Sequence, residues 1–223
     1  MKKTLLILLI VFLISGCASF RSGIQGKYKG ENEKNLGAEK VSVLFIFDHY
    51  HQAKGFDAIP KLEKKYQILD DFDDLFIDAL AELSNVKKYN TFTEFSSDVA
   101  DPKRRAEKDS LITVHDYILR MKFMRENSFA RYFLGTLFSS VSMTALPIPF
   151  RKNYLFTVDV YDSDDILVKT YTRKASLTTW VQAGLIFIYP FHTEKRKAEE
   201  IYIQFLHDVF RQIESEKVLV KNI

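Results

Sequence analysis

Cysteine is almost absent from this chain: Cys17 is the single one among 223 residues. One thiol excludes an internal disulfide and any zinc site built from several thiolates. The eight glycines form no phosphate-binding loop, and the chain contains no nucleophile elbow and no zinc-protease helix motif. These motifs give no support to catalysis, so we expect neither an enzyme nor a bound cofactor.

An excess of charge of either sign is also lacking. The chain has 32 Lys and Arg against 29 Asp and Glu, a formal net charge of +3. Two of the basic residues, Lys2 and Lys3, stand at the very start, which leaves 30 basic side chains against 29 acidic ones in the remainder. A nucleic-acid partner requires a concentrated basic face, and this balance does not favour one.

The first apolar run is too short for a comfortable membrane span. It is uncharged from Thr4 to Phe20, 17 residues, and is interrupted by Ser15 and Gly16, whereas a transmembrane helix needs about 20 predominantly apolar residues. A short basic start, an apolar segment and then small residues are typical of a secretory signal. The sequence therefore predicts a signal peptide over residues 1–16.

The motif Ile14-Ser15-Gly16-Cys17 closes this segment and resembles the lipobox of bacterial lipoproteins. The resemblance implies that a diacylglycerol is attached to the thiol of Cys17 and that a peptidase cuts just before it. It also implies that the new amino group is often acylated. Cys17 is then a lipid-attachment residue, and several acyl chains hold firmly because each buried methylene contributes about 0.8 kcal/mol.

The residues after the cysteine, Ala18 and Ser19, include no Asp beside it. In lipoproteins of enteric type, this pattern implies transport to the outer membrane, on its periplasmic side. In a source with one membrane, the same anchor implies the outer face of the plasma membrane. Residues 17–40 are polar and lack an apolar period from Ser19 onward, so we expect a lipidated flexible tether there.

The remaining residues, 41–223, can build one sizeable core, so we expect a single globular domain. Val41 to Phe47 is apolar on both parities, which is typical of a central strand buried on two faces. Helical spacing follows from Phe72 to Leu83. Tyr89 to Phe95 has the composition of a strand, and a charged connector or short helix is expected over Asp101 to Asp109.

Alternation from Tyr117 to Phe123 predicts a half-exposed strand. Two strands flanking Asp162-Ser-Asp-Asp165 predict a hairpin. The chain closes with an amphipathic helix that Thr193 can cap, and its apolar stripe consists of Ala198, Ile201, Tyr202, Phe205, Leu206, Val209, Phe210 and Ile213. This order predicts an α+β or α/β sandwich, with a mixed sheet covered by helices.

The strand–helix–strand opening and the long closing helix, over about residues 41 to 213, resemble a known fold group in element order. It comprises the amino-terminal domain of TolB, the penicillin-binding-protein activator lipoproteins and the curli-secretion lipoprotein. The resemblance implies a small α/β domain. It does not fix a function.

Two groups of polar residues invite a metal-site interpretation, and both have a simpler one. His49 and His51, next to Asp48, could begin a site, but the sequence offers no third convincing ligand. Solvated loop histidines are favoured. Acids from Asp70 to Asp74 lack the glycine and the distant Glu of a calcium loop, and the start of a helix explains them. We expect no metal.

The distinctive feature of the chain after Cys17 is a pair of uncharged segments, 132–150 and 175–193, each of 19 residues with histidine neutral. Basic residues flank both: Arg125, Arg131, Arg151 and Lys152 for the first, and Arg173, Lys174, Lys195, Arg196 and Lys197 for the second. Hydroxyl residues and prolines make both poor transmembrane helices. Either both segments are core, or they form an apolar surface facing a membrane or a partner.

On the surface interpretation, aromatic residues lie at the membrane interface and the basic residues meet anionic head groups. The candidate surface residues are Tyr132, Leu137, Phe138, Trp180, Ile186 and Tyr189. We therefore expect a lipid-anchored, non-enzymatic accessory or assembly factor of the cell envelope. It contacts membrane lipid through Cys17 and an envelope protein or a second copy of itself. The alternatives are a self-associating outer-membrane channel or export component, and a periplasmic hydrolase.

Overall fold

The computed structural model describes residues 15–31, 33–54, 60–64, 72–128, 137, 148–183 and 193–220. The apolar part of the predicted signal peptide, from Thr4 to Ile14, lies outside these residues.

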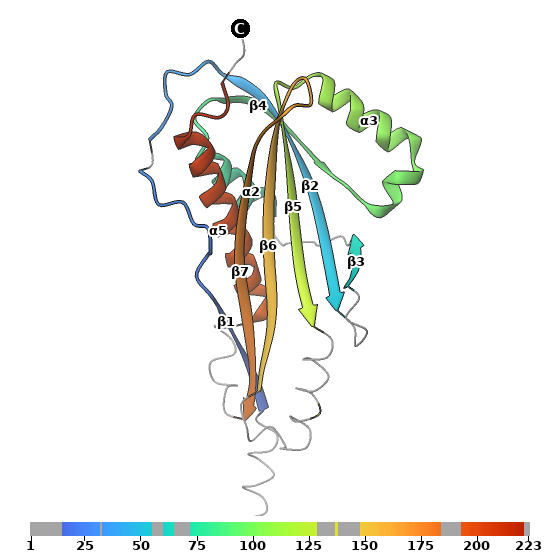
Figure 1. Ribbon diagram of the computed structural model, residues 1–223, viewed down its shortest axis with the longest axis vertical. Helices are drawn as coiled ribbons and strands as arrows, with labels where there is room; N and C mark the ends of the chain where they lie inside the picture. The colour runs from blue at the N-terminus through green and yellow to red at the C-terminus, as the bar shows by residue number, and fades with distance from the viewer. Residues whose placement is uncertain are drawn as a thin grey trace, which may run out of the picture.

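One mixed β-sheet organises the described chain (Figure 1). Its strands are β1 (Ser15–Arg21), β2 (Val41–Lys54), β3 (Pro60–Lys64), β4 (Val86–Thr93), β5 (Tyr117–Ser128), β6 (Ile148–Asp162) and β7 (Leu167–Ala183). The order is β1-β7-β6-β5-β2-β3, and β4 also pairs with β2. β2 is parallel to β4 and β5, whereas the other pairs are antiparallel. With its helices, this is an α+β fold, as predicted.

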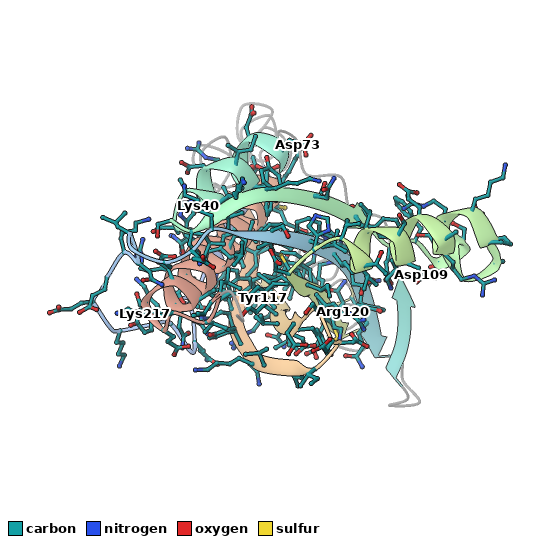
Figure 2. All side chains as sticks on the ribbon, turned by 90° about the horizontal axis from the view of Figure 1, so that it is seen from above. Lys40, Asp73, Asp109, Tyr117, Arg120 and Lys217 are labelled. Atoms are coloured by element: carbon teal, nitrogen blue, oxygen red, sulfur yellow. The ribbon has the colours of Figure 1, made fainter. Side chains whose placement is uncertain are left out.

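Helices cover the sheet unequally. They are α2 (Phe72–Leu80), α3 (Pro102–Thr113) and α5 (Glu194–Ser215), with a short 3-10 helix, η1 (Ser96–Ala100). α2 and α5 pack on one face, which we call the inner face, and α3 packs on the other, outer face. Figure 2 shows Asp109 of α3 and Lys217, just after α5, on opposite sides of the molecule. No helix in the described part is long and apolar enough to cross a membrane.

The inner face carries the main core. All eight residues of the stripe predicted for the closing helix are buried there, and the side-chain oxygen of Thr193 accepts the N–H of Arg196 at the start of α5. Phe156 and Phe205 stack with ring centroids 5.7 Å apart. Stacked aromatic pairs stabilise a core beyond their buried area alone, so this contact ties α5 to the sheet.

The outer face has a smaller apolar cluster of Leu44, Ile46, Phe92 and Ile118. Leu111 and Ile112 of α3 pack against it. β2 is therefore buried on both faces, as predicted. The prediction of a half-exposed β5 is wrong at Ile118, which is fully buried because α3 covers its side of the strand.

The hairpin between β6 and β7 turns at the predicted acidic residues. The carboxylate of Asp162 accepts the N–H groups of Asp164 and Ile166, and Asp165 has a positive φ of 57°. Asp tolerates this left-handed conformation better than most side chains, which explains its place in the turn. β6 and β7 run on beyond the predicted hairpin into Ile148–Phe150 and Ala175–Ala183 of the two uncharged segments.

Candidate functional site

Cys17 lies in the edge strand β1, at the end of the sheet where β6 begins and β7 ends (Figure 1). It pairs with Val181 of β7, and Val181 pairs in turn with Ile148 of β6. Cys17, Val181 and Ile148 thus form one row across three strands. This row brings the predicted lipid-attachment residue beside the described parts of both uncharged segments. We call the region around this row the Cys17 end.

Side-chain contacts fix β1 beyond its backbone pairing. The hydroxyls of Ser19 and Thr179 hydrogen bond at 2.8 Å. The guanidinium of Arg21 donates to Glu200 at 2.9 Å and to the amide oxygen of Gln204 at 2.7 Å, both on α5. Arg21, four residues after Cys17, therefore ties β1 to the closing helix.

The chain after β1 continues along the sheet and then along α5. Ser22 donates its N–H to the carbonyl of Ser176 at 2.8 Å, and Gln25 exchanges backbone hydrogen bonds with Lys174. Further on, the N–H of Tyr28 donates to the carboxylate of Asp208 at 3.0 Å. We call residues 22–31 and 33–35 the strap.

A flexible tether is expected over residues 17–40, but residues 17–31 and 33–35 lie against the sheet and α5. The physical reason lies on α5, where Asp208 and Glu214 are 5% and 2% exposed. Buried carboxylates require donors. Asp208 receives the N–H of Tyr28, and Glu214 receives that of Asn35 at 2.7 Å.

Of the six candidate surface residues, the structure describes two, Leu137 and Trp180. Tyr132, Phe138, Ile186 and Tyr189 lie outside the described residues. Leu137 is 50% exposed. Trp180 is half-buried in β7, opposite Ala18 on one side and Pro149 on the other. Phe20, two residues from Ala18 on the same face of β1, is 42% exposed. Phe20 thus exposes a large apolar side chain near the Cys17 end, where Trp180 is half-buried.

The flanking basic residues differ in exposure. Arg151 and Lys195 are exposed, and the side chain of Arg196 is 63% exposed. Lys152 is paired with Glu194. Arg173, expected to meet head groups, is instead buried, because strand alternation turns it inward to an ion pair with Asp208.

Burial is the main cause that raises the pKa of the Cys17 thiol above its usual value, and the nearby Glu194 carboxylate adds to the effect. The free thiol at this place therefore stays protonated at neutral pH. Nucleophilic catalysis by cysteine requires a thiolate. This environment gives no support to a catalytic thiol, and it is compatible with a thiol that carries lipid.

No family model and no curated protein matches this chain. Among solved structures, a point variant of PelC, solved as a dodecamer from Paraburkholderia phytofirmans, has 8% sequence identity and a TM-score of 0.28, over 89% of this chain and 98% of that one. The PelC dodecamer in a second crystal form gives 8% identity and a TM-score of 0.25, over 88% and 98% of the two chains. Similarity at this level does not bear on function.

The remaining candidates lie away from the Cys17 row. His49 is not a solvated loop residue: it is buried in β2 and stacks on Phe123 with ring centroids 5.1 Å apart. His51 bonds to the amide of Asn127. Asp73 and Asp74 are exposed in the first turn of α2, as a helix start predicts. Among the described residues, no group of three or more His, Cys, Asp or Glu could hold a metal ion.

Proposed function

We propose that this protein is a lipoprotein anchored by Cys17 to the periplasmic side of the outer membrane, where it serves as a non-enzymatic accessory or assembly factor of the envelope. The observation that supports this best is the row of Cys17, Val181 and Ile148. Lipid on Cys17 leaves the domain from the same end of the sheet as the two uncharged segments.

The charge distribution at the Cys17 end supports close contact with lipid head groups. Lys195 and Arg196 are exposed there. Each basic residue near an anionic membrane surface contributes about 1 kcal/mol of attraction. Because the strap lies on the domain, the anchor has no long free linker, and the Cys17 end rests on the membrane.

The opposite end of the sheet offers a surface for protein contacts. Three consecutive aliphatic residues after the hairpin turn, Ile166, Leu167 and Val168, are 61%, 52% and 46% exposed. Val114 and Val220 are exposed as well, 59% and 47%. Contiguous exposed apolar residues are typical of interaction sites. In an upright molecule, this surface points away from the bilayer, towards an envelope protein.

Replacing Cys17 by Ser tests the anchor, because a hydroxyl cannot take the thioether. We expect mass spectrometry of the parent protein to find acyl chains on residue 17 and no residue before it. Cys17→Ser should carry no lipid and should be either unprocessed or soluble, whereas Phe20→Ala, an exposed change in the same strand, should be cut and acylated like the parent. Lipid retained by Cys17→Ser contradicts the proposal.

A further inference from the structure

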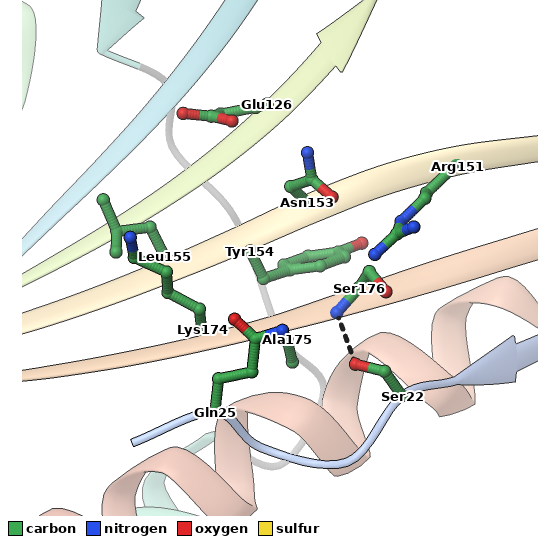
Figure 3. Close-up of a pocket in the computed structure, with 10 residues that line it drawn as sticks. All are labelled: Ser22, Gln25, Glu126, Arg151, Asn153, Tyr154, Leu155, Lys174, Ala175 and Ser176. Atoms are coloured by element: carbon green, nitrogen blue, oxygen red, sulfur yellow. Dashed lines mark hydrogen bonds between the residues drawn. The ribbon is translucent and has the colours of Figure 1, made fainter.

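A cavity of about 310 Å³ opens on the flank of the sheet, where the strap leaves β1 (Figure 3). Its lining comes from β5, β6, β7 and the strap, and most of it is polar. The lining residues are Ser22, Gln25, Glu126, Arg151, Asn153, Tyr154, Leu155, Lys174, Ala175 and Ser176. This cavity is separate from the row that carries Cys17.

Strand register places four polar residues of the cavity in one line. Glu126 of β5 pairs with Asn153 of β6, and Asn153 pairs with Ser176 of β7. The hydroxyl of Ser22 in turn accepts the N–H of Ser176 at 2.9 Å (Figure 3). A carboxylate, an amide and two hydroxyl residues thus follow one another across the sheet.

Two cations flank this line from opposite sides. Arg151 precedes Asn153 by two residues along β6, and Lys174 lies opposite Leu155, two residues beyond Asn153. Two residues of strand span about 7 Å. Arg151 and Lys174 therefore stand on either side of the polar line, and both are exposed to a ligand.

The charged groups of the cavity are available for a ligand. Arg151 and Lys174 are exposed, whereas the less exposed Arg21 and Lys122 are paired with Glu200 at 2.9 Å and with Asp159 at 3.1 Å. Within the described ranges, the side chains of Glu126, Arg151 and Lys174 make no ion pair and no hydrogen bond. Three unpaired charges around one cavity favour a ligand with complementary charges.

We propose that this cavity binds a small soluble zwitterion, with a phosphate or carboxylate held between Arg151 and Lys174 and an ammonium or hydroxyl donor directed to Glu126. The two cations outnumber the single carboxylate, so an anionic group is favoured over a simple amine. The amide of Asn153 and the hydroxyl of Ser176 can bond the polar atoms between the two ends, whereas the hydroxyl of Ser22 already donates to the carbonyl of Gly23.

The position of the cavity favours a soluble ligand over a head group in the bilayer. Ser22 is five residues along the chain from Cys17, which is about 17 Å in an extended strand. The head-group region on one side of a bilayer is only about 5–8 Å thick. The cavity therefore lies above the head groups when the Cys17 end rests on the membrane. The choice of a soluble ligand rests on this proposed orientation, whereas binding by the cavity itself does not require the lipid anchor.

Calorimetric titration of the full-length protein in detergent with phosphoethanolamine, inorganic phosphate and ethanolamine tests the proposal. We expect saturable binding of phosphoethanolamine, weaker binding of phosphate and none of ethanolamine. Lys174→Gln should raise the Kd for phosphoethanolamine about tenfold, the effect of one lost charged hydrogen bond. The matched change on α3, Lys103→Gln, should leave it unchanged.

A second variant separates the two ends of the ligand. Glu126→Gln should weaken phosphoethanolamine binding while leaving phosphate binding intact, because phosphate lacks the ammonium group. No saturable binding by the parent protein, or the same Kd in Lys174→Gln, overturns the proposal. Protein reconstituted into vesicles with and without phosphatidylethanolamine should bind soluble phosphoethanolamine equally well. A weaker apparent affinity with the lipid present means that the bilayer occupies the cavity, which overturns its assignment to a soluble ligand.

Discussion

Arg173 of β7 and Asp208 of α5 form an ion pair whose side chains are only 4% and 5% exposed. The guanidinium also donates to Gln212, and Asp208 accepts the N–H of Tyr28 in the strap. One buried carboxylate thus joins the sheet, the closing helix and the strap. Removing it leaves an uncompensated buried cation.

We expect Asp208→Ala to lower the free energy of unfolding by roughly 3–5 kcal/mol, the usual cost of breaking a buried ion pair from one side. Lys169→Ala is the matched control, since Lys169 is also on β7 but pairs with Glu216 at the surface. Its cost should be at most about 1 kcal/mol. Denaturant unfolding measures both, and equal costs contradict the structural role of Asp208.

Phe205 tests the packing of α5. It is 1% exposed and stacks on Phe156, so Phe205→Ala should cost roughly 3–5 kcal/mol. Lys197 is a poor control because it is partly buried against Glu200. Arg196→Ala is a better one and should change stability by less than about 0.5 kcal/mol. Thermal unfolding that shows similar losses for Phe205→Ala and Arg196→Ala contradicts the assigned helix face.

Tyr154 makes the fold sensitive to alkaline pH. Burial is the main cause that raises the pKa of Tyr154 from its usual 10.0 to about 12. A raised pKa in the folded state means that stability is complete below pH 10 and is lost as pH rises towards 12. Tyr154→Phe should therefore lose less stability between these pH values than the parent.

Some alkaline sensitivity should remain in that variant. Burial and the hydrogen bond to Glu216 also raise the pKa of Tyr171. Urea unfolding at intervals of pH measures the dependence. If parent and Tyr154→Phe show the same alkaline loss, the phenol of Tyr154 does not contribute as described.

The basic residues at the Cys17 end predict salt-dependent membrane binding without lipid. The form used for this test begins at residue 17 with Cys17→Ser, because a form that begins at Gly26 lacks β1. We expect the longer form to bind vesicles with anionic lipid and to release them in high salt. Lys195→Gln with Arg196→Gln should weaken binding by about 2 kcal/mol, at about 1 kcal/mol per basic residue.

The control for this experiment lies at the other end of the sheet. Lys87 and Lys88 are exposed in β4, next to the start of β2. Changing both to Gln alters the net charge by the same amount. Equal weakening by the two double variants means that binding follows net charge and not the Cys17 end.

The elements with a strong apolar period could be predicted from the sequence. The closing helix has eight apolar residues at helical spacing, and the β6–β7 hairpin has a clear acidic turn. β1 and the strap could not be predicted, because they are held mainly by backbone groups and by polar contacts from distant residues. A signal was present on α5, where Asp208 and Glu214 interrupt an otherwise apolar face and require buried partners.

The candidate site was predictable only in part. Cys17 follows from its motif, but its position beside Val181 depends on the pairing of β1 with β7, which no local pattern encodes. Arg173 illustrates the same limit. Arg173 lies on the same side of β7 as the buried residues Tyr171 and Ala175, so strand alternation indicated its burial. The sequence alone does not show that Asp208 lies opposite it.

The central claim is that Cys17 holds the Cys17 end of the sheet directly on the membrane. Fluorophores on Arg196→Cys and Asp164→Cys test it, because the proposed lipid on Cys17 would leave the introduced thiol as the reactive one. β6 alone separates the two ends by about 46 Å. In vesicles with quencher on the lipid head groups, we predict strong quenching at position 196 and almost none at position 164. A flexible tether predicts similar quenching at both positions, and that result would contradict a Cys17 end held directly on the membrane.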